Sequence, residues 1–238
     1  MNRQVVTVDG LAGTGKTSIS KLLAERLGFV HLSTGLLYRA VGLLALREKV
    51  DRTDEELVSF IVDDHSLQLV LDSNRSARVL VDGIDVFDDL YSPEVSESTS
   101  QVAQFGRVRE KLVGAQREAF PGEDLVAEGR DMGSLIFPDA HFKFFVSTDE
   151  PVKVERRLKQ LKEARGAMSE QEAKSLKEKM KIEIHERDKR DSEGGFATTF
   201  QQPDMYLVDN STQPLEIVVE NLYNVLLDHG IKPRMSGN

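Results

Sequence analysis

The chain has 238 residues, of which 39% are hydrophobic, so it can bury a sizeable core and is not disordered as a whole. Its formal net charge of −9 at pH 7 argues against binding to nucleic acid or to anionic membranes, which needs a basic surface. The absence of cysteine excludes disulfides, thiolate metal sites and thiol catalysis. No apolar run is long enough for a membrane span or a secretory leader. We therefore expect a cytoplasmic protein, taken to be a monomer, that binds neither membrane nor nucleic acid.

The first segment has the pattern of a strand, a glycine-rich loop and a helix. An apolar run at 5–8 precedes the loop at 10–17, and apolar residues at helical spacing follow it up to Leu27. The loop matches G-x-x-x-x-G-K-[ST], whose backbone N–H groups surround a polyphosphate at the N-terminus of the next helix. It predicts a nucleoside triphosphate site, with Lys16 on the β- and γ-phosphates as a catalytic residue and Thr17 as the ligand of Mg²⁺. The expected contacts are Gly10, Leu11, Ala12, Gly13, Thr14, Gly15, Lys16, Thr17 and Ser18.

A glycine-rich turn that binds nothing is the alternative to this phosphate loop. A chance match to the motif is expected in roughly one chain in a hundred of this length, and the flanking strand and helix make coincidence rarer.

Two helices and an antiparallel unit are predicted next. After a short strand at 29–32, Ser33 or Thr34 caps one helix, and a second begins at Thr53, where Glu56 completes a capping box. The residues expected on the apolar side of this second helix are Leu57, Phe60 and Ile61. Apolar residues then alternate at 67–71 and 79–81. This alternation indicates an antiparallel hairpin or meander at about 66–90, which we interpret as an insert.

The second half of the chain returns to alternating helices and strands. A helical region opens at Ser92-Pro93 and is divided by Gly106, and a later helix begins at a capping box formed by Ser169 and Glu172. The further buried strands are predicted at 125–127, 142–146 and 205–208. The pattern predicts an α/β fold whose parallel sheet is covered by helices on both faces, with ligands beyond the carboxyl ends of the strands.

Three arginines are placed to bind a second anion. Arg39, Arg109 and Arg130 lie near predicted strand ends in an otherwise acidic protein. Arg130 is followed by Asp131, and a local ion pair between the two is the alternative interpretation. The segment at 156–190 is dense in charge, which is typical of either a solvated helical hairpin or a lid that brings arginines to a transferring phosphate.

Five motifs in this order make the chain resemble the bacterial cytidylate kinases, enzymes of the P-loop NTPase fold that phosphorylate CMP and dCMP with ATP and Mg²⁺. The motifs are Asp9 to Thr17, Ser33 to Arg39, Ser100 to Arg109, Glu128 to Gly133 with Phe137 to Ala140, and Glu186 to Asp191. The resemblance implies a core domain at 1–34, 93–154 and 196–238, a monophosphate-binding insert at 35–92, and a helical lid at 155–195.

The resemblance also implies roles for residues. Those assigned to the acceptor nucleotide are Thr34, Arg39, Ser100, Arg109, Arg130, Asp131, Arg187 and Asp191. Among them, Ser100, Arg109 and Asp131 would recognise the cytosine edge, whose amino donor and ring acceptors a carboxylate and an arginine complement. Arg187, which also faces the pentose with Asp191, and Arg190 are the lid residues expected to be catalytic.

Two departures from the family pattern stand out. Leu11 replaces the usual proline of the phosphate loop, which affects loop stiffness more than phosphate contacts. Gly194 replaces an arginine that would join Arg39 and Arg130 on the acceptor phosphate, unless Lys189 or Arg190 substitutes for it. The competing functions are a P-loop kinase with another small acceptor and a nucleotide-binding module without transfer activity.

Overall fold

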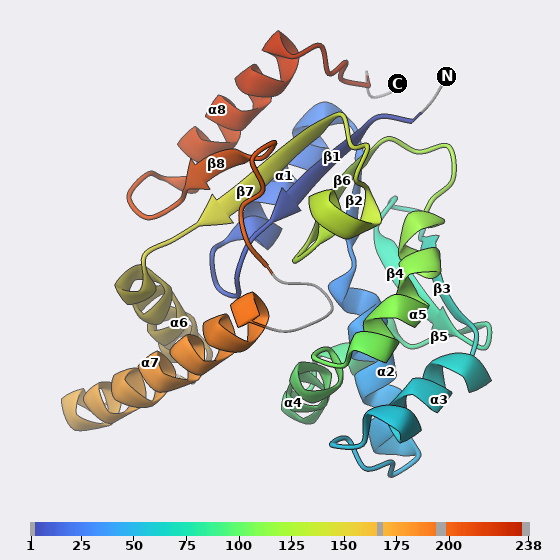
Figure 1. The fold of residues 1–238 in the computed structure, drawn as a ribbon. Coiled ribbons are helices and arrows are strands. Elements are labelled where there is room, and N and C mark those ends of the chain that lie inside the picture. Colours follow the sequence, from blue (N-terminus) through green and yellow to red (C-terminus); the bar gives the residue numbers. More distant parts are fainter. Residues whose placement is uncertain (1–2, 166–168, 194–198, 235–238) are drawn as a thin grey trace.

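Five parallel strands form the central sheet of the computed structural model, which describes residues 3–165, 169–193 and 199–234. The strands are β1 (Val5–Asp9), β2 (Val30–Ser33), β6 (Leu125–Gly129), β7 (Phe142–Ser147) and β8 (Tyr206–Asp209). Their order is β2-β6-β1-β7-β8 (Figure 1). The predicted strands are confirmed to within two residues. All five run parallel, so the loops that follow them gather at one edge of the sheet.

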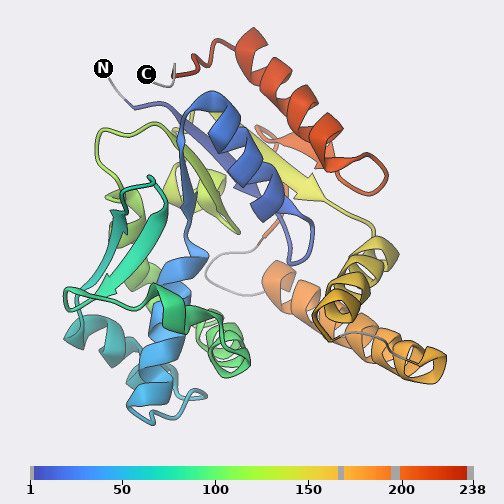
Figure 2. The same ribbon diagram turned by 180° about the vertical axis from the view of Figure 1, so that it is seen from behind.

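Helical elements cover both faces of this sheet, as the pattern predicts. Helices α1 (Lys16–Leu27) and α8 (Leu215–Asp228) pack side by side on one face, seen in front of the strands in Figure 2. Their buried side chains join those of β1 and β7 in one cluster. On the other face, the short helix η2 (Met132–Ile136) packs with Ala119 and Phe120 against β2 and β6. The P-loop NTPase fold is thereby confirmed.

The expected insert is a compact unit beside the carboxyl ends of the strands. It contains α2 (Gly35–Arg47), α3 (Glu55–Asp64), a sheet of β3 (Leu67–Leu71), β4 (Ala77–Val81) and β5 (Ile84–Asp85), and the 3-10 turn η1 (Phe87–Tyr91). The strands are antiparallel, which confirms the predicted meander.

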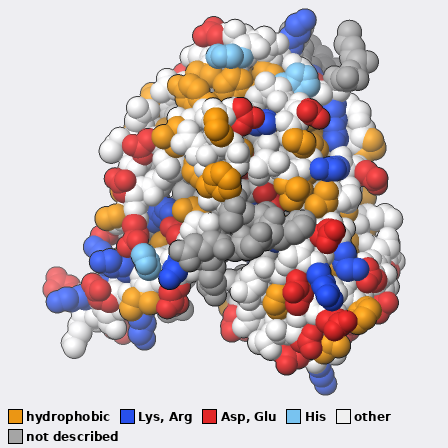
Figure 3. All heavy atoms as spheres, viewed as in Figure 1, with side chains coloured by type: hydrophobic (Ala, Val, Ile, Leu, Met, Phe, Trp, Pro, Cys, Tyr) orange, Lys and Arg blue, Asp and Glu red, His pale blue; other side chains and the backbone are white. Residues whose placement is uncertain are grey.

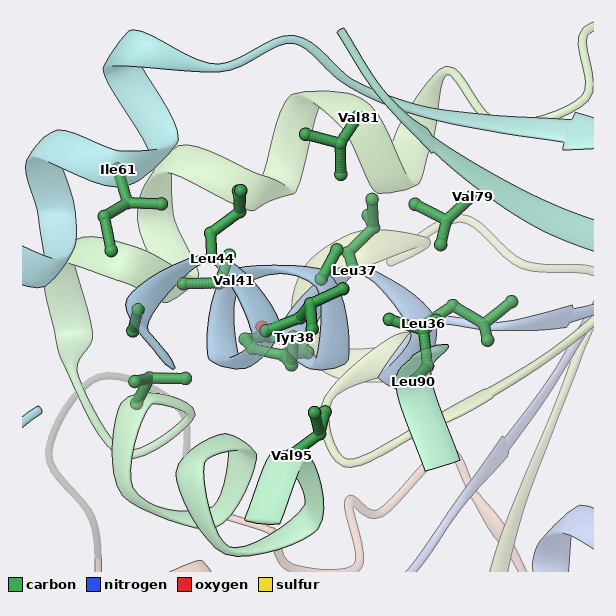
Figure 4. Packing of buried hydrophobic residues seen from close by; sticks show 14 of the residues in the cluster. Leu36, Leu37, Tyr38, Val41, Leu44, Ile61, Val79, Val81, Leu90 and Val95 are labelled. Atoms are coloured by element: carbon green, nitrogen blue, oxygen red, sulfur yellow. The ribbon is translucent and has the colours of Figure 1, made fainter. Parts of the chain in front are cut away.

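Helix α2 is the centre of the insert. It is buried along most of its length, and Leu37, Val41 and Leu44 meet Ile61, Val79 and Leu90 in Figure 4. Two further helices share this cluster: α4 (Pro93–Val102) and α5 (Gly106–Arg117). Their bounds confirm that a helix opens at Pro93 and that Gly106 divides the region. The domain boundaries themselves stay a prediction.

Two details of α3 were predicted wrongly. The N-cap is Asp54, whose carboxylate accepts hydrogen bonds from the N–H groups of Glu56 and Leu57, while the Thr53 hydroxyl donates to Asp51. The capping box of Thr53 and Glu56 therefore does not form. Leu57 and Phe60 are 46% and 52% exposed, and the buried residues of α3 are Val58, Ser59 and Ile61.

His65 joins three parts of the insert. Its Nε2 lies 2.6 Å from Glu48, just after α2, and its Nδ1 lies 2.6 Å from Asp82, between β4 and β5. The hydrogen bond to Asp82 is the largest of the effects that raise the pKa of His65 above its usual 6.5. Folding therefore favours the protonated, positively charged form of His65.

We predict that this cluster stabilises the protein below pH 6.5 and that the stabilisation is lost as the pH rises through the raised pKa. Replacing His65 by Gln should therefore lower the free energy of unfolding more at about pH 6 than at about pH 9. Urea unfolding at both pH values measures this difference. His185→Gln is the control, because His185 is 70% exposed, and an equal pH dependence in both variants would contradict the prediction.

Helices α6 (Glu150–Arg165) and α7 (Glu170–Glu193) form an antiparallel pair that projects from the sheet. Val154, Leu158 and Met180 make a small apolar contact between them. Their outer surface carries both charge signs (Figure 3). Ser169 and Glu172 bond each other's N–H groups, which confirms that capping box. None of the described helices is long and apolar enough to cross a bilayer.

Candidate active site

The phosphate loop at 10–17 connects β1 to α1 and has a backbone that requires glycine. Gly15 has a φ of 85°, and a Cβ there would lie 2.5 Å from the Asn210 amide nitrogen. Gly10 has a φ of 153°, and a Cβ there would lie 2.4 Å from the Val146 carbonyl oxygen. The loop therefore lies directly against the residues around the ends of β7 and β8, and larger side chains would displace it.

Side chains outside the motif hold this loop in shape. The carbonyl of Thr14 accepts hydrogen bonds from Asn210 Nδ2 at 2.7 Å and from Thr148 Oγ1 at 3.1 Å. Lys16 is 8% exposed, and its Nζ donates to the Leu11 carbonyl at 3.1 Å. The ammonium group thus lies across the loop at the N-terminus of α1, where a polyphosphate would meet it. Sequence reasoning did not single out Thr148 or Asn210, because their role depends on contacts between distant segments.

A cluster of oxygen atoms lies beside the loop. Glu128, near the end of β6, is 4% exposed and accepts hydrogen bonds from Thr17 Oγ1 at 2.9 Å and Ser33 Oγ at 2.8 Å. His31 Nε2 lies 3.9 Å from the same carboxylate. Burial lowers the pKa of His31, although the Glu128 charge opposes this shift, so burial favours the neutral imidazole. Hydroxyl and carboxylate oxygens are the ligands that Mg²⁺ prefers, so Thr17 and Glu128 together fit this ion.

The predicted base-recognition residues include a buried ion pair. Arg109 Nη2 donates to Asp131 Oδ2 at 2.6 Å, and the two side chains are only 12% and 4% exposed. The Arg109 guanidinium also lies over the Tyr38 ring, 5.7 Å from its centroid. Burial is the main cause that raises the pKa of Tyr38 to about 12. Three elements, α2, α5 and the segment after β6, thus supply one buried polar cluster.

Arg39, the first of the arginines predicted to bind a phosphate, is held by the segment that follows β5. Its Nη1 donates to the Leu90 carbonyl at 2.9 Å and to Ser96 Oγ at 3.1 Å, and its guanidinium lies 5.2 Å from the Tyr91 ring centroid. Tyr91 is 55% exposed, so its ring forms a surface beside Arg39 that sequence reasoning missed.

Three more of the residues predicted to bind the acceptor lie on α4, just before α2 and just after β6. Arg130 Nη1 donates to the Gly10 carbonyl at 3.2 Å, so this arginine reaches the phosphate loop. Thr34 is buried and donates to the Glu128 carbonyl at 3.2 Å; it precedes α2 without capping it through its side chain. Ser100 is half-buried on α4.

Three of the predicted site residues belong to the lid helix α7. Arg187, Arg190 and Asp191 lie on α7, but their side chains, like the whole of Gly194, fall outside the described part of the chain. Two residues of α6 that the sequence did not assign to the site lie near the loop. These are Lys153, whose Nζ pairs with Asp188 at 2.6 Å, and Arg156, whose Nη2 donates to the Asn210 carbonyl at 2.8 Å.

Comparisons with known proteins agree over nearly the whole chain. The model of a family described as cytidylate kinase matches residues 6–227. A cytidylate kinase from Pelotomaculum thermopropionicum is 37% identical over 215 residues, which cover 90% of this chain and 92% of that protein. One from Pseudomonas aeruginosa (strain LESB58) is 36% identical over 219 residues, 92% of this chain and 93% of that protein. One from Symbiobacterium thermophilum is 33% identical over 218 residues, with the same two coverages of 92% and 93%.

Proposed function

The chain belongs to the cytidylate kinase family, and we propose that it transfers the γ-phosphoryl group of ATP to CMP or dCMP, giving CDP or dCDP and ADP. The observation that supports this most directly is the placement of the Arg109–Asp131 pair at the end of β6, beside β1 and its phosphate loop. One edge of the sheet thus brings together a phosphate loop and a buried pair of polar side chains, and this pair suits a small polar base.

ATP binds in this proposal with its β- and γ-phosphates in the loop at 10–17. Backbone N–H groups and Lys16 carry their negative charge, and the N-terminus of α1 adds to the potential. Arg156 lies beside Gly15 and is a further cation near this site, at 3.7 Å from a Cβ built on that glycine.

CMP binds with its base toward Asp131 and Arg109 and its phosphate toward Arg39 and Arg130. An Asp131 carboxylate that accepts from the cytosine amino group would repel the carbonyl oxygen that uracil carries there. Ser100 would add a hydroxyl to base recognition from α4. The lid residues Arg187, Arg190 and Asp191 would complete the site from α7.

Transfer needs no dedicated general base. The acceptor phosphate has a second pKa near 6, so it is mostly a dianion at pH 7 and is itself a competent nucleophile. One of its oxygens forms a bond to the γ-phosphorus while the bond from that phosphorus to the β–γ bridging oxygen breaks, and ADP leaves. Lys16 and the arginines neutralise charge on the transferring group and hold the two phosphates in line.

Thr17 and Glu128 would hold Mg²⁺. When bound, the ion neutralises charge shared by the β- and γ-phosphates. The described residues include no group of three or more His, Cys, Asp or Glu that could bind a metal, so water and phosphate oxygens would complete its coordination. We further propose that the protein acts as a cytoplasmic monomer.

We expect CMP and dCMP to be better acceptors than UMP, AMP and GMP, and we expect activity to disappear in excess chelator. A coupled assay of ADP formation with these five monophosphates measures kcat/KM for each. A purine monophosphate with the highest kcat/KM would favour a kinase of another acceptor. ATP binding without transfer to any monophosphate would favour a nucleotide-binding module.

A further inference from the structure

Asp9 is the last residue of β1, and its buried carboxylate has no part in the roles described above. The residue is 1% exposed. Its Oδ1 accepts a hydrogen bond from the Met132 N–H at 2.7 Å, and its Oδ2 accepts one from the Gly133 N–H at 2.8 Å. Both donors directly follow Arg130 and Asp131 in the chain. One side chain therefore connects the strand that leads into the phosphate loop with the segment that carries two acceptor residues.

Other contacts fix the same segment against the same strand. The Gly10 carbonyl accepts from Arg130 at 3.2 Å, so residues 9–10 bond to this segment at three points. Gly133 packs so closely that a Cβ there would lie 2.8 Å from Thr7 Oγ1. These hydrogen bonds and this close packing hold the segment against β1.

We propose that Asp9 is a positioning residue for phosphoryl transfer, which fixes the segment with Arg130 and Asp131 relative to the phosphate loop. The inference rests on the proposed function, in which Lys16 binds the donor and Arg130 the acceptor. In-line transfer requires both phosphates to be placed accurately, and a displacement of about 1 Å can lower the rate about a hundredfold. Asp9 acts through other residues, so its loss should lower kcat more than it raises the KM for ATP.

The bonds to Asp9 depend on its charge state, because a protonated carboxyl presents an O–H donor to one of the two N–H groups. Burial raises the pKa of Asp9 to about 6, and the bonds from Gly133 and Met132 oppose this shift. The charged groups that face Asp9 are Asp131, which raises the pKa further, and Lys16, which lowers it. Below about pH 6 the wild-type protein should therefore come to resemble an Asp9→Asn variant.

The experiment compares Asp9→Asn with Asp124→Asn. Asp124 is also a buried carboxylate, which accepts from the Gln4 N–H at 2.6 Å and from Arg234 at 2.7 Å, but it precedes β6 at the opposite end of the strand. Both variants should melt at a lower temperature than the wild type. Only Asp9→Asn should lower kcat, by about tenfold to a hundredfold near pH 8, with the KM for ATP changed much less.

The pH profile supplies the second readout. The ratio of wild-type to Asp9→Asn kcat should fall toward one between about pH 8 and pH 5. The acceptor phosphate titrates near pH 6 as well, but it does so in both enzymes, so the ratio removes its effect. If folded Asp9→Asn matches Asp124→Asn in kcat at every pH, Asp9 is only structural and the inference is wrong.

Two further measurements cover the case in which Asp9→Asn does not fold and the case in which the proposed acceptor site is wrong. If Asp9→Asn does not fold, the amide resonances of Met132 and Gly133 in the unaltered protein report the titration of Asp9. Because the phosphate of CMP titrates in the same range, its midpoint is measured by phosphorus NMR: a kcat that follows the amide resonances and not the phosphate supports the inference, and a kcat that stays constant or follows the phosphate overturns it. Arg130→Ala tests the acceptor role itself: an unchanged KM for CMP would refute the proposed phosphate site independently of the result for Asp9.

Discussion

Lys16→Ala should abolish phosphoryl transfer and leave the fold intact, with kcat lower by about a thousandfold. The ammonium group bonds to the Leu11 carbonyl across the phosphate loop and takes no part in the apolar cluster beneath α1. Its removal therefore deletes the cation proposed to meet the β- and γ-phosphates and leaves the apolar cluster beneath α1 unchanged. The coupled assay gives kcat, and thermal unfolding followed by circular dichroism shows whether the variant is folded.

Lys21→Ala is the matched control for this prediction. Lys21 lies on the same helix and is exposed, so its removal changes the net charge equally but leaves the loop as it is. Its turnover should stay close to that of the wild type. Near-normal turnover in a folded Lys16→Ala protein would show that the loop is not the donor site.

Local sequence patterns predicted most helices and strands of this fold, because each pattern reflects what the backbone of a short segment requires. Gly10 and Gly15 mark a backbone that other residues cannot adopt, and Ser92 with Pro93 marks a helix start through capping and a fixed φ. The order of the strands in the sheet, in contrast, depends on contacts between distant segments. β6 lies between β1 and β2 although more than ninety residues separate it from β2 along the chain, and no local pattern encodes that pairing.

The two errors in α3 concern its N-cap and its buried face, which the local sequence alone does not determine. Thr53 and Asp54 are adjacent and both can cap a helix, so the sequence leaves two possible starts. The apolar residues Leu57, Val58, Phe60 and Ile61 surround much of the helix. Which of them are buried depends on where α2 and α5 pack, and this contact buries Val58 and Ile61 while Leu57 and Phe60 stay exposed.

Candidate site residues could be named from the sequence where a motif contains them, and their roles stay predictions. The phosphate loop follows from its spacing, and Arg109 with Asp131 followed from the resemblance to a family. The contacts that support them were not predictable in this way. Asp9 and Glu128 stand inside the motifs, but their hydrogen bonds, like those of Asn210, are to segments far away in the chain, and no spacing along the sequence encodes them.

The second large effect is expected at Asp131. Its replacement by Ala leaves the Arg109 guanidinium buried without its carboxylate, which should lower the free energy of unfolding by about 3–5 kcal/mol. If the carboxylate also accepts from the cytosine amino group, the preference for CMP over UMP should fall by about 1–3 kcal/mol, roughly fivefold to 150-fold in the ratio of kcat/KM. Urea unfolding measures the first quantity, and the acceptor assay measures the second.

Two further variants make the result at Asp131 interpretable. Asp131→Asn keeps the shape of the side chain and one acceptor oxygen, so it should fold better than Asp131→Ala and still lose part of the preference. Asp89→Ala is the control, because Asp89 pairs with Arg47 at 2.6 Å on the surface of the insert and is 58% exposed. It should change neither stability nor acceptor preference by more than about 1 kcal/mol. A folded Asp131→Asn or Asp131→Ala enzyme that keeps the wild-type ratio of CMP to UMP would show that the buried ion pair is structural and that the base is recognised elsewhere.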